Sequence, residues 1–301
     1  MPPISFNELP YFSDLFCDYI NGNPALKKFY NGSFKSQEDI AAHIEHLRNQ
    51  TYQRNALTDI LALQNKTFHA REQTFAHIEQ LREPDTFAIV TGQQVGLFGG
   101  PLYTIYKIIT ALQLCESLAA QHPGSKFVPV FWLESEDHDL DEANHTYVLD
   151  HAGALLKLEY ERERGTDGNP VLSGSVGSVI FDERIKAVLE SIEKNLNQTE
   201  FHPDVMKLIS QSYAVGNSFV RAFAMLLQGI FPEEGLILLD PMDKNIKKLL
   251  APVFRCELET TPRVSEAVIS QSALLEINYH AQVKARSINL FMLWKKRAFR
   301  N

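Results

Sequence analysis

The strongest constraint on the fold is a glycine-rich loop, residues 91–101, which separates a short apolar run from a long helical pattern. The preceding run TFAIV (86–90) is apolar and partly β-branched, as in a buried strand. Apolar residues then recur at spacings of three and four from Pro101 to Ala120, which predicts a helix. A second apolar run, FVPVFWL (127–133), predicts another strand. Strand, crossover helix and strand form the βαβ unit of a parallel sheet, so we expect an α/β fold.

Other segments extend this unit in both directions. Helical spacing fills much of residues 36–84, and the run GLILLD (235–240) predicts a third parallel strand. Between the second and third strands, residues 146–200 indicate an insertion with antiparallel strands, a flexible glycine- and serine-rich stretch, and a helix near 182–195. Pro129 lies inside the second strand, and because proline has no amide hydrogen to donate, this places the strand near an edge of the sheet.

Composition excludes several classes of protein. With 301 residues and 45% hydrophobic residues, the chain can build a substantial core. Its net charge of -8 argues against a nucleic-acid binder, and no apolar run is long enough to span a membrane. Cys17, Cys115 and Cys256 lie far apart without metal-ligand spacing, and no secretory signal is evident at the N-terminus. We therefore expect a cytoplasmic protein, with Cys115 on the apolar face of a helix as a core thiol.

The glycine loop predicts a binding site for an anion, a carboxylate or a nucleotide phosphate. Its glycines allow the backbone to approach a ligand closely, and a helix that starts at Pro101 directs free N–H groups and a positive dipole into the loop. The candidate binding residues are Gly92, Gln93, Gln94, Gly96, Gly99, Gly100 and Pro101. The spacing matches neither the Walker pattern nor the dinucleotide fingerprint. A loop that merely packs the helix onto the sheet remains the alternative.

An acidic segment follows the second strand. The stretch ESEDHDLDEANH (134–145) emerges at the same edge of the sheet as the glycine loop. Crowded carboxylates raise one another's pKa, and histidine exchanges protons near neutral pH, so Asp137 and His138 are the candidate catalytic residues. Carboxylates there could also hold Mg²⁺ beside a phosphate, whereas a solvated acidic loop is the simpler alternative. No His or Cys pair has the spacing of zinc ligands, and we assign no metal site.

Four motifs in order resemble those of the bacillithiol biosynthesis cysteine-adding enzyme family. They are TGQQVGLFGGPLYTIYK (91–107), PVFWLESEDHDLDEANH (129–145), GLILLDP (235–241) and NYHAQV (278–283). The resemblance extends to about residue 290. It implies a Rossmann-like core related to class I aminoacyl-tRNA synthetases, with connecting-peptide insertions and a C-terminal coiled coil. In the second motif it points to Glu136, Asp137, His138, Asp139, Glu142 and Asn144 as functional residues.

The resemblance also implies an organisation and an activity. We expect a helical segment (1–85) packed on the core, a first βαβ unit (86–145), an inserted connecting-peptide region (146–200) and a continuation of the core (201–301). The implied activity is a ligase that adds cysteine to glucosaminyl-malate by forming an amide. A carboxylate must be activated for that reaction, so ATP is a reasonable co-substrate. A homodimer is plausible for the family.

One departure from the family leaves two further hypotheses open. Family members look far longer than this chain, and its last ten residues do not resemble their continuation, so we expect a C-terminally truncated chain that lacks the coiled coil and exposes a sheet edge prone to aggregation. One alternative to the ligase is a nucleotide-binding enzyme of another pathway that transfers phosphoryl or nucleotidyl groups. The other is a non-catalytic remnant.

Overall fold

The computed structural model describes residues 4–161 and 174–290, which form two compact units. One unit contains residues 52–249, and the other contains residues 4–51 together with 250–290. These two units are defined by which residues pack together in space. The division into four parts that the sequence suggests stays a prediction.

The unit of residues 52–249 holds every described strand. Its strands are β1 (Thr86–Gln94), β2 (Lys126–Glu134), β3 (His145–Leu149), β4 (Leu155–Glu159) and β5 (Ile237–Leu239). Its helices are α3 (Arg54–Thr67), α4 (Glu72–Gln80), α5 (Tyr103–Gln121), α6 (Leu140–Ala143), α7 (Arg184–Asn195), α8 (His202–Ser212), α9 (Phe219–Ile230) and the start of α10 (Lys244–Thr260). Short 3-10 turns cover Leu97–Gly99 and Val176–Ser178.

The central sheet is parallel, in the order β1-β2-β5, as the βαβ pattern predicts. The expectation that Pro129 lies near an edge was wrong, because β2 is the central strand. Pro129 pairs in register with Ile89 of β1, and the ladder with β5 begins one residue later, at Val130. The proline is tolerated because no β5 residue stands opposite it.

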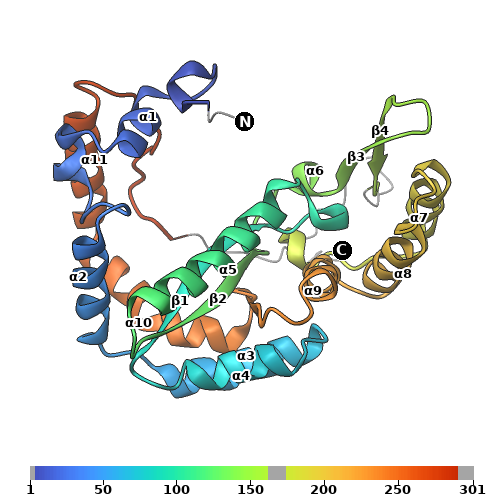
Figure 1. The fold of residues 1–301 in the computed structure, drawn as a ribbon, viewed down its shortest axis with the longest axis horizontal. Helices are drawn as coiled ribbons and strands as arrows, with labels where there is room; N and C mark the ends of the chain where they lie inside the picture. Colours follow the sequence, from blue (N-terminus) through green and yellow to red (C-terminus); the bar gives the residue numbers. More distant parts are fainter. Residues whose placement is uncertain (1–3, 162–173, 291–301) are drawn as a thin grey trace, which may run out of the picture. The chain divides into compact units, whose positions relative to one another are not determined.

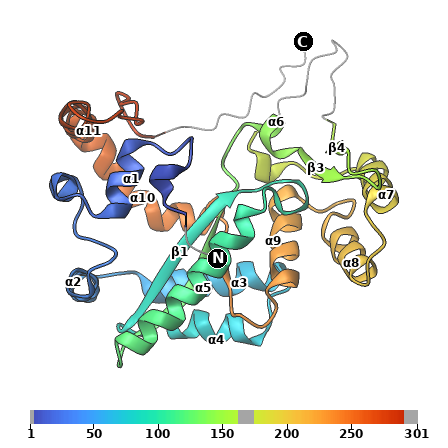
Figure 2. The same cartoon turned by 45° about the horizontal axis from the view of Figure 1, so that its top comes forward.

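Two layers of helices cover the sheet, because alternate side chains of each strand point to opposite faces. Val128 and Val130 of β2 pack with Leu61 of α3 and Ile78 of α4 in one apolar cluster. Phe131 and Leu133 of β2 point to the other face of the sheet, where they join a larger cluster that includes Ile108 of α5. Figure 1 shows α5 along the β1–β2 sheet with α3 and α4 on the other side, and Figure 2 shows β1 running beside α5. The expected Rossmann-like α/β architecture is confirmed.

The outer edge of β5 is covered by side-chain amides, and the aggregation-prone edge expected from the sequence stays a prediction for the rest of the sheet. The amide of Asn65 donates to the carbonyl oxygen of Leu238 at 2.8 Å and accepts from its N–H at 3.0 Å. Gln64 bonds both backbone groups of Asp240 in the same way, at 3.0 and 2.9 Å. Two neighbouring residues of α3 thus take the place of a fourth strand.

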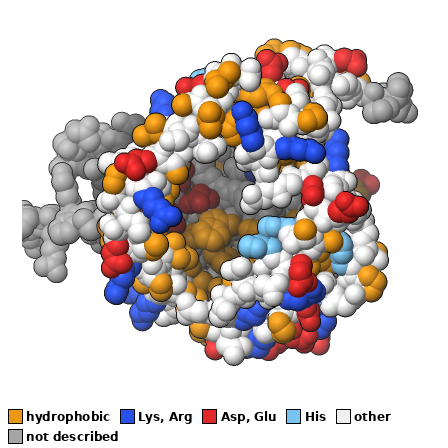
Figure 3. Space-filling view, turned by 90° about the vertical axis from the view of Figure 1, so that its left-hand side faces the viewer, with side chains coloured by type: hydrophobic (Ala, Val, Ile, Leu, Met, Phe, Trp, Pro, Cys, Tyr) orange, Lys and Arg blue, Asp and Glu red, His pale blue; other side chains and the backbone are white. Residues whose placement is uncertain are grey.

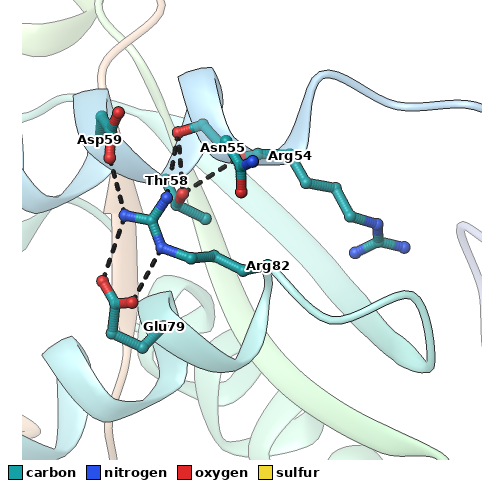
Figure 4. Close-up of polar contacts among 6 residues, drawn as sticks. All are labelled: Arg54, Asn55, Thr58, Asp59, Glu79 and Arg82. Atoms are coloured by element: carbon teal, nitrogen blue, oxygen red, sulfur yellow. Dashed lines mark hydrogen bonds and ion pairs between the residues drawn. The ribbon is translucent and has the colours of Figure 1, made fainter.

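Polar contacts also fix α3 to the chain around it. The guanidinium of Arg82 donates to Asp59 on α3 at 2.7 Å and to Glu79 on α4 at 2.8 Å (Figure 4). These two carboxylates raise the pKa of Arg82, Glu79 most strongly. Arg54 donates to the carbonyl oxygens of Leu81 and Thr86, which lie on either side of the turn into β1.

The insertion between β2 and β5 contains an antiparallel hairpin, β3–β4, as expected, followed by α7 near its predicted range. Residues 164–173 of the stretch predicted to be flexible lie outside the described residues. Ser218 caps α9, since its hydroxyl accepts from the N–H of Arg221 at 3.3 Å.

The other unit is helical in its described part. It contains α1 (Asp14–Asn21), α2 (Gln37–Arg48), the remainder of α10 and α11 (Arg263–Leu275), with 3-10 turns at Phe6–Glu8 and Pro24–Phe29. The NYHAQV motif follows α11, and the hydroxyl of its Tyr279 donates to Asp18 at 2.6 Å. This bond raises the pKa of Tyr279.

No helix in the described ranges is both long and apolar enough to cross a bilayer. On the face drawn in Figure 3, the coloured lysine and arginine side chains are interspersed with acidic ones. That face presents no continuous basic patch of the kind that binds a nucleic-acid backbone.

Two cysteines are expected to differ in reactivity. Cys115 is buried on α5, as predicted, and burial raises the pKa of its thiol to about 12, whereas Cys256 is exposed. The thiolate is the reactive species. We therefore expect iodoacetamide at pH 8 to alkylate Cys256 in the native protein while Cys115 reacts only after unfolding, as read by peptide mass. Equal labelling of both thiols in folded protein would contradict this assignment.

Candidate functional site

The two predicted motifs meet at the carboxyl edge of the sheet. Gln94 and Glu134 are paired in register at the ends of β1 and β2, so the glycine loop and the acidic segment leave the sheet side by side. The side-chain amide of Gln94 then donates to the carboxylate of Asp137 at 2.6 Å. This bond joins the first motif to the second.

A pocket of about 580 Å³ opens between the glycine loop and the segment that begins β3. One wall is formed by residues 93–96 and 100–103, and the other by residues 142, 143 and 145–147. The backbone around Gly96 leaves little room for a side chain. A Cβ atom there would lie 3.3 Å from the Cα of Gly100 and 3.9 Å from the carbonyl oxygen of Ala143. A larger residue at this position would therefore narrow the pocket.

The pocket lining combines apolar residues such as Val95 and Leu102 with uncharged polar groups and a few ionisable ones. It presents the amides of Gln93 and Gln94, the hydroxyls of Tyr103, Thr146 and Tyr147, the carboxylate of Glu142 and the imidazole of His145. The Nδ1 of His145 donates to the carbonyl oxygen of Asp141 at 2.8 Å, which orients the ring. Such a lining suits a ligand with hydroxyl and amino groups.

A lysine stands behind one wall of the pocket. The ammonium group of Lys107 donates to the side-chain oxygen of Gln93 at 2.9 Å and lies 5.0 Å from the ring centre of Tyr103. Gln93 in turn donates to the hydroxyl of Tyr103 at 3.2 Å. Lys107 therefore orients two lining side chains and adds positive charge on that side of the pocket.

The structure separates the predicted loop residues into two groups. Gln93, Gln94, Gly96, Gly100 and Pro101 line the pocket. Two other glycines serve close packing instead. A Cβ at Gly92 would lie 2.7 Å from the carbonyl oxygen of Trp132 on β2, and one at Gly99 would lie 3.1 Å from the side chain of Leu226.

The start of α5 differs from the expectation. The helix begins at Tyr103, two residues beyond Pro101. The carbonyl oxygen of Pro101 accepts the N–H of Thr104 at 2.9 Å, and the N–H groups of Gly99 and Gly100 are bonded within the protein, to Tyr213 and Leu97. Part of the N–H cradle predicted for an anion is therefore already occupied.

The acidic segment spreads its side chains in different directions. Asp137 is held beside the pocket, with 29% of its side chain exposed, whereas the side chain of His138 is 90% exposed and lies 3.5 Å from Asp137. Asp139 caps α6, and Glu136 pairs with Lys247. Asn144 is buried, with its amide donating to Glu159 at 3.4 Å. Within the described ranges, no three potential metal ligands converge.

Sequence reasoning missed a second polar cluster, at the ends of β2 and β5. The buried hydroxyl of Ser135 donates to the carboxylate of Asp240 at 2.5 Å, and Glu134 and the Lys247–Glu136 ion pair lie in the same region. Burial raises the pKa of both Glu134 and Asp240. Glu134 and Glu136 belong to the acidic segment found in the sequence, and the signal for their partner was that the GLILLD motif ends in Asp240, directly after a buried strand.

The raised pKa of Asp240 predicts a pH-dependent cost to stability. Its pKa in the unfolded chain is about 3.9, so the folded state loses stability as the pH rises above that value and the buried carboxylate ionises. Asp240→Asn keeps an oxygen for Ser135 and removes the charge. We expect the variant to melt above the wild type at pH 7, with the difference shrinking toward pH 4 in thermal scans. A difference that is constant across this range would contradict the assignment.

Comparisons with known proteins agree with the motifs. The family model described as bacillithiol biosynthesis BshC, N-terminal Rossmann-like domain, matches residues 2–300. A Salinibacter ruber protein named "Putative cysteine ligase BshC" is 41% identical over 97% of this chain and 52% of its own length. Proteins of the same name from Chlorobaculum tepidum and Bacillus cereus are 39% and 31% identical, over 94% and 91% of this chain. The chain spans about half the length of the curated relatives it matches.

Proposed function

The chain belongs to the bacillithiol biosynthesis BshC family, in its N-terminal Rossmann-like domain, and on that premise we propose that it carries the substrate-binding core of a cysteine ligase. The reaction is the addition of cysteine to glucosaminyl-malate by amide formation. The observation that carries the proposal is the Gln94–Asp137 bond, which joins the two family motifs beside one pocket.

The pocket chemistry supports glucosaminyl-malate as the ligand. This molecule bears sugar hydroxyls and an amine together with the carboxylates of its malyl group. The hydroxyl, amide and carboxylate groups of the lining match the sugar and the amine. The malyl carboxylates would face Gln93, where Lys107 adds positive charge. Gly96 and Gly100 leave room for backbone approach on the same wall.

The reaction requires a deprotonated amine and an activated carboxyl group. The neutral amine attacks the activated carboxyl carbon, a C–N bond forms as the bond to the activating group breaks, and the nitrogen loses one proton while keeping the other as the amide N–H. In the proposed reaction Asp137 attracts the amine and accepts its proton, and the bond from Gln94, which lines the pocket, supports this role. His138 is solvent-facing and can pass that proton to water. ATP is the proposed co-substrate, because the carboxyl group must be activated before the amine can attack it. A homodimer stays a prediction.

Calorimetry on the 301-residue chain tests the proposal. Glucosaminyl-malate should release or absorb heat with a saturable isotherm, and incubation with cysteine and ATP should give a product with the mass of the cysteinyl amide. A chain that binds ATP and transfers its phosphoryl or nucleotidyl group without responding to glucosaminyl-malate belongs to another pathway. Folded protein that binds neither compound would overturn the ligase and favour a non-catalytic remnant.

A further inference from the structure

The glycine loop adopts a backbone conformation that needs support from outside the loop. Three consecutive residues, Phe98, Gly99 and Gly100, have positive φ values of 52°, 93° and 67°. Glycine accepts this region readily, but Phe98 carries a Cβ that disfavours it. A residue held in such a conformation persists only where its surroundings enforce it.

The support comes from one buried hydroxyl. Tyr213 follows α8, more than 100 residues along the chain, and its side chain is fully buried. Its hydroxyl donates to the carbonyl oxygen of Gly96 at 2.7 Å and accepts the N–H of Gly99 at 3.2 Å. Its ring packs edge-to-face against Phe98, with 5.0 Å between ring centres. One side chain therefore contacts three of the four residues from Gly96 to Gly99.

Burial keeps this hydroxyl protonated. It raises the pKa of Tyr213 well above the usual tyrosine range, so the group donates to Gly96 at every pH at which the protein is handled. Gly96 lines the pocket, and Gly99 directly precedes Gly100, which lines it as well. The two hydrogen bonds thus tie down both ends of the turn that forms one pocket wall.

We propose that Tyr213 is a positioning residue: its hydroxyl holds the glycine loop in the conformation that the pocket needs to bind its ligand. This inference takes the identity of the ligand from the proposed function. The part that concerns the hold of Tyr213 on the loop depends only on the loop geometry. Tyr213 lines no part of the pocket, so it acts through Gly96 and Gly99.

Removal of the hydroxyl alone separates positioning from packing. The ring of Tyr213 also packs against Phe181, at 5.6 Å between centres, and Tyr213→Phe keeps that contact. Tyr160→Phe is the matched control, because Tyr160 is also buried and its hydroxyl bonds Asp182 both as donor and as acceptor at 3.2 Å, outside the loop. Both variants lose one buried hydroxyl and keep an aromatic ring.

Hydrogen exchange and calorimetry give the readouts. We expect amides 96–100 to exchange about tenfold faster in Tyr213→Phe, since one hydrogen bond is lost on each side of the turn, and to be unchanged in Tyr160→Phe. We expect the Kd of glucosaminyl-malate to rise about tenfold in Tyr213→Phe alone. Unchanged loop exchange, or a looser loop with unchanged Kd, would overturn the positioning role.

The experiment keeps the two proposals apart. A wild-type chain that does not bind glucosaminyl-malate overturns the proposed function. Faster hydrogen exchange at amides 96–100 in Tyr213→Phe would still support the conclusion that the Tyr213 hydroxyl holds the loop. If Tyr213→Phe does not fold, hydrogen exchange measured on the wild-type protein still tests the proposal. The Gly99 amide, bonded to a buried hydroxyl, should then exchange more slowly than an unbonded amide, and exchange at the unbonded rate would overturn the proposal.

Discussion

Replacing Asn65 with leucine is expected to lower the free energy of unfolding by about 4 kcal/mol, because two buried backbone groups of Leu238 then lose their partners at about 1–3 kcal/mol each. Asn65 has no exposed surface. Its amide donates to the carbonyl oxygen of Leu238 at 2.8 Å and accepts from its N–H at 3.0 Å. Leucine has a similar volume, so the change removes hydrogen bonds without opening a large cavity.

Urea unfolding followed by circular dichroism measures the loss. Asn55→Leu is the matched control, since Asn55 lies on the same helix with its side chain exposed, and this change should stay within about 0.5 kcal/mol. The same variants test the covered edge, because a β5 strand without its amide partners is free to pair with other chains. An Asn65→Leu protein as stable and as monodisperse as the control would show that the amides do not close the edge.

The βαβ unit was predictable because its signals are local. A short β-branched run, a helix-length repeat and a second apolar run give strand, helix and strand within 50 residues, and parallel pairing follows from the crossover length. The same logic predicted that residues after β1 and β2 share one edge, which the register of Gln94 with Glu134 confirms. The helix start was two residues off, since a helix boundary depends on local hydrogen bonds rather than on periodicity.

The contacts that complete the unit were not predictable, because they join distant positions. Asn65 and Leu238 are 173 residues apart, and Ser135 and Asp240 are 105 apart. A polar residue on an amphipathic helix is normally predicted to be exposed to solvent, and nothing in the pattern indicates which polar residue is buried instead. Burial and partner are properties of packing, and the sequence shows them only once the fold is known.

The roles of individual glycines illustrate the same limit. Gly92, Gly96 and Gly99 look equivalent in the motif, yet the first allows close approach of β2, the second lines the pocket and the third accepts a left-handed conformation beside Leu226. The motif therefore mixes residues that bind with residues that shape the loop. Substitutions at the three positions should accordingly have different consequences, for stability at Gly92 and for the pocket at Gly96.

Within the proposed ligase, Asp137→Asn is expected to lower the rate of amide formation about 100-fold, whereas His138→Ala should lower it less than about threefold. Positioned acid–base groups contribute factors of this order, and exposed ones contribute little. Asp137 is fixed by Gln94 at 2.6 Å and by the N–H of Asp139 at 3.0 Å. The side chain of His138 is 90% exposed and can be replaced by water as a proton carrier. Initial rates with cysteine, glucosaminyl-malate and ATP measure both variants.

Asp204→Asn controls for the loss of one negative charge, because Asp204 is exposed in the first turn of α8 and does not line the pocket. Its rate should equal that of the wild type. A thermal scan of Asp137→Asn separates a chemical loss from an unfolded protein, since a folded variant melts near the wild type. If His138→Ala proves the slower enzyme, the imidazole is the essential group, and the carboxylate of Asp137 then serves to orient Gln94 at the pocket wall.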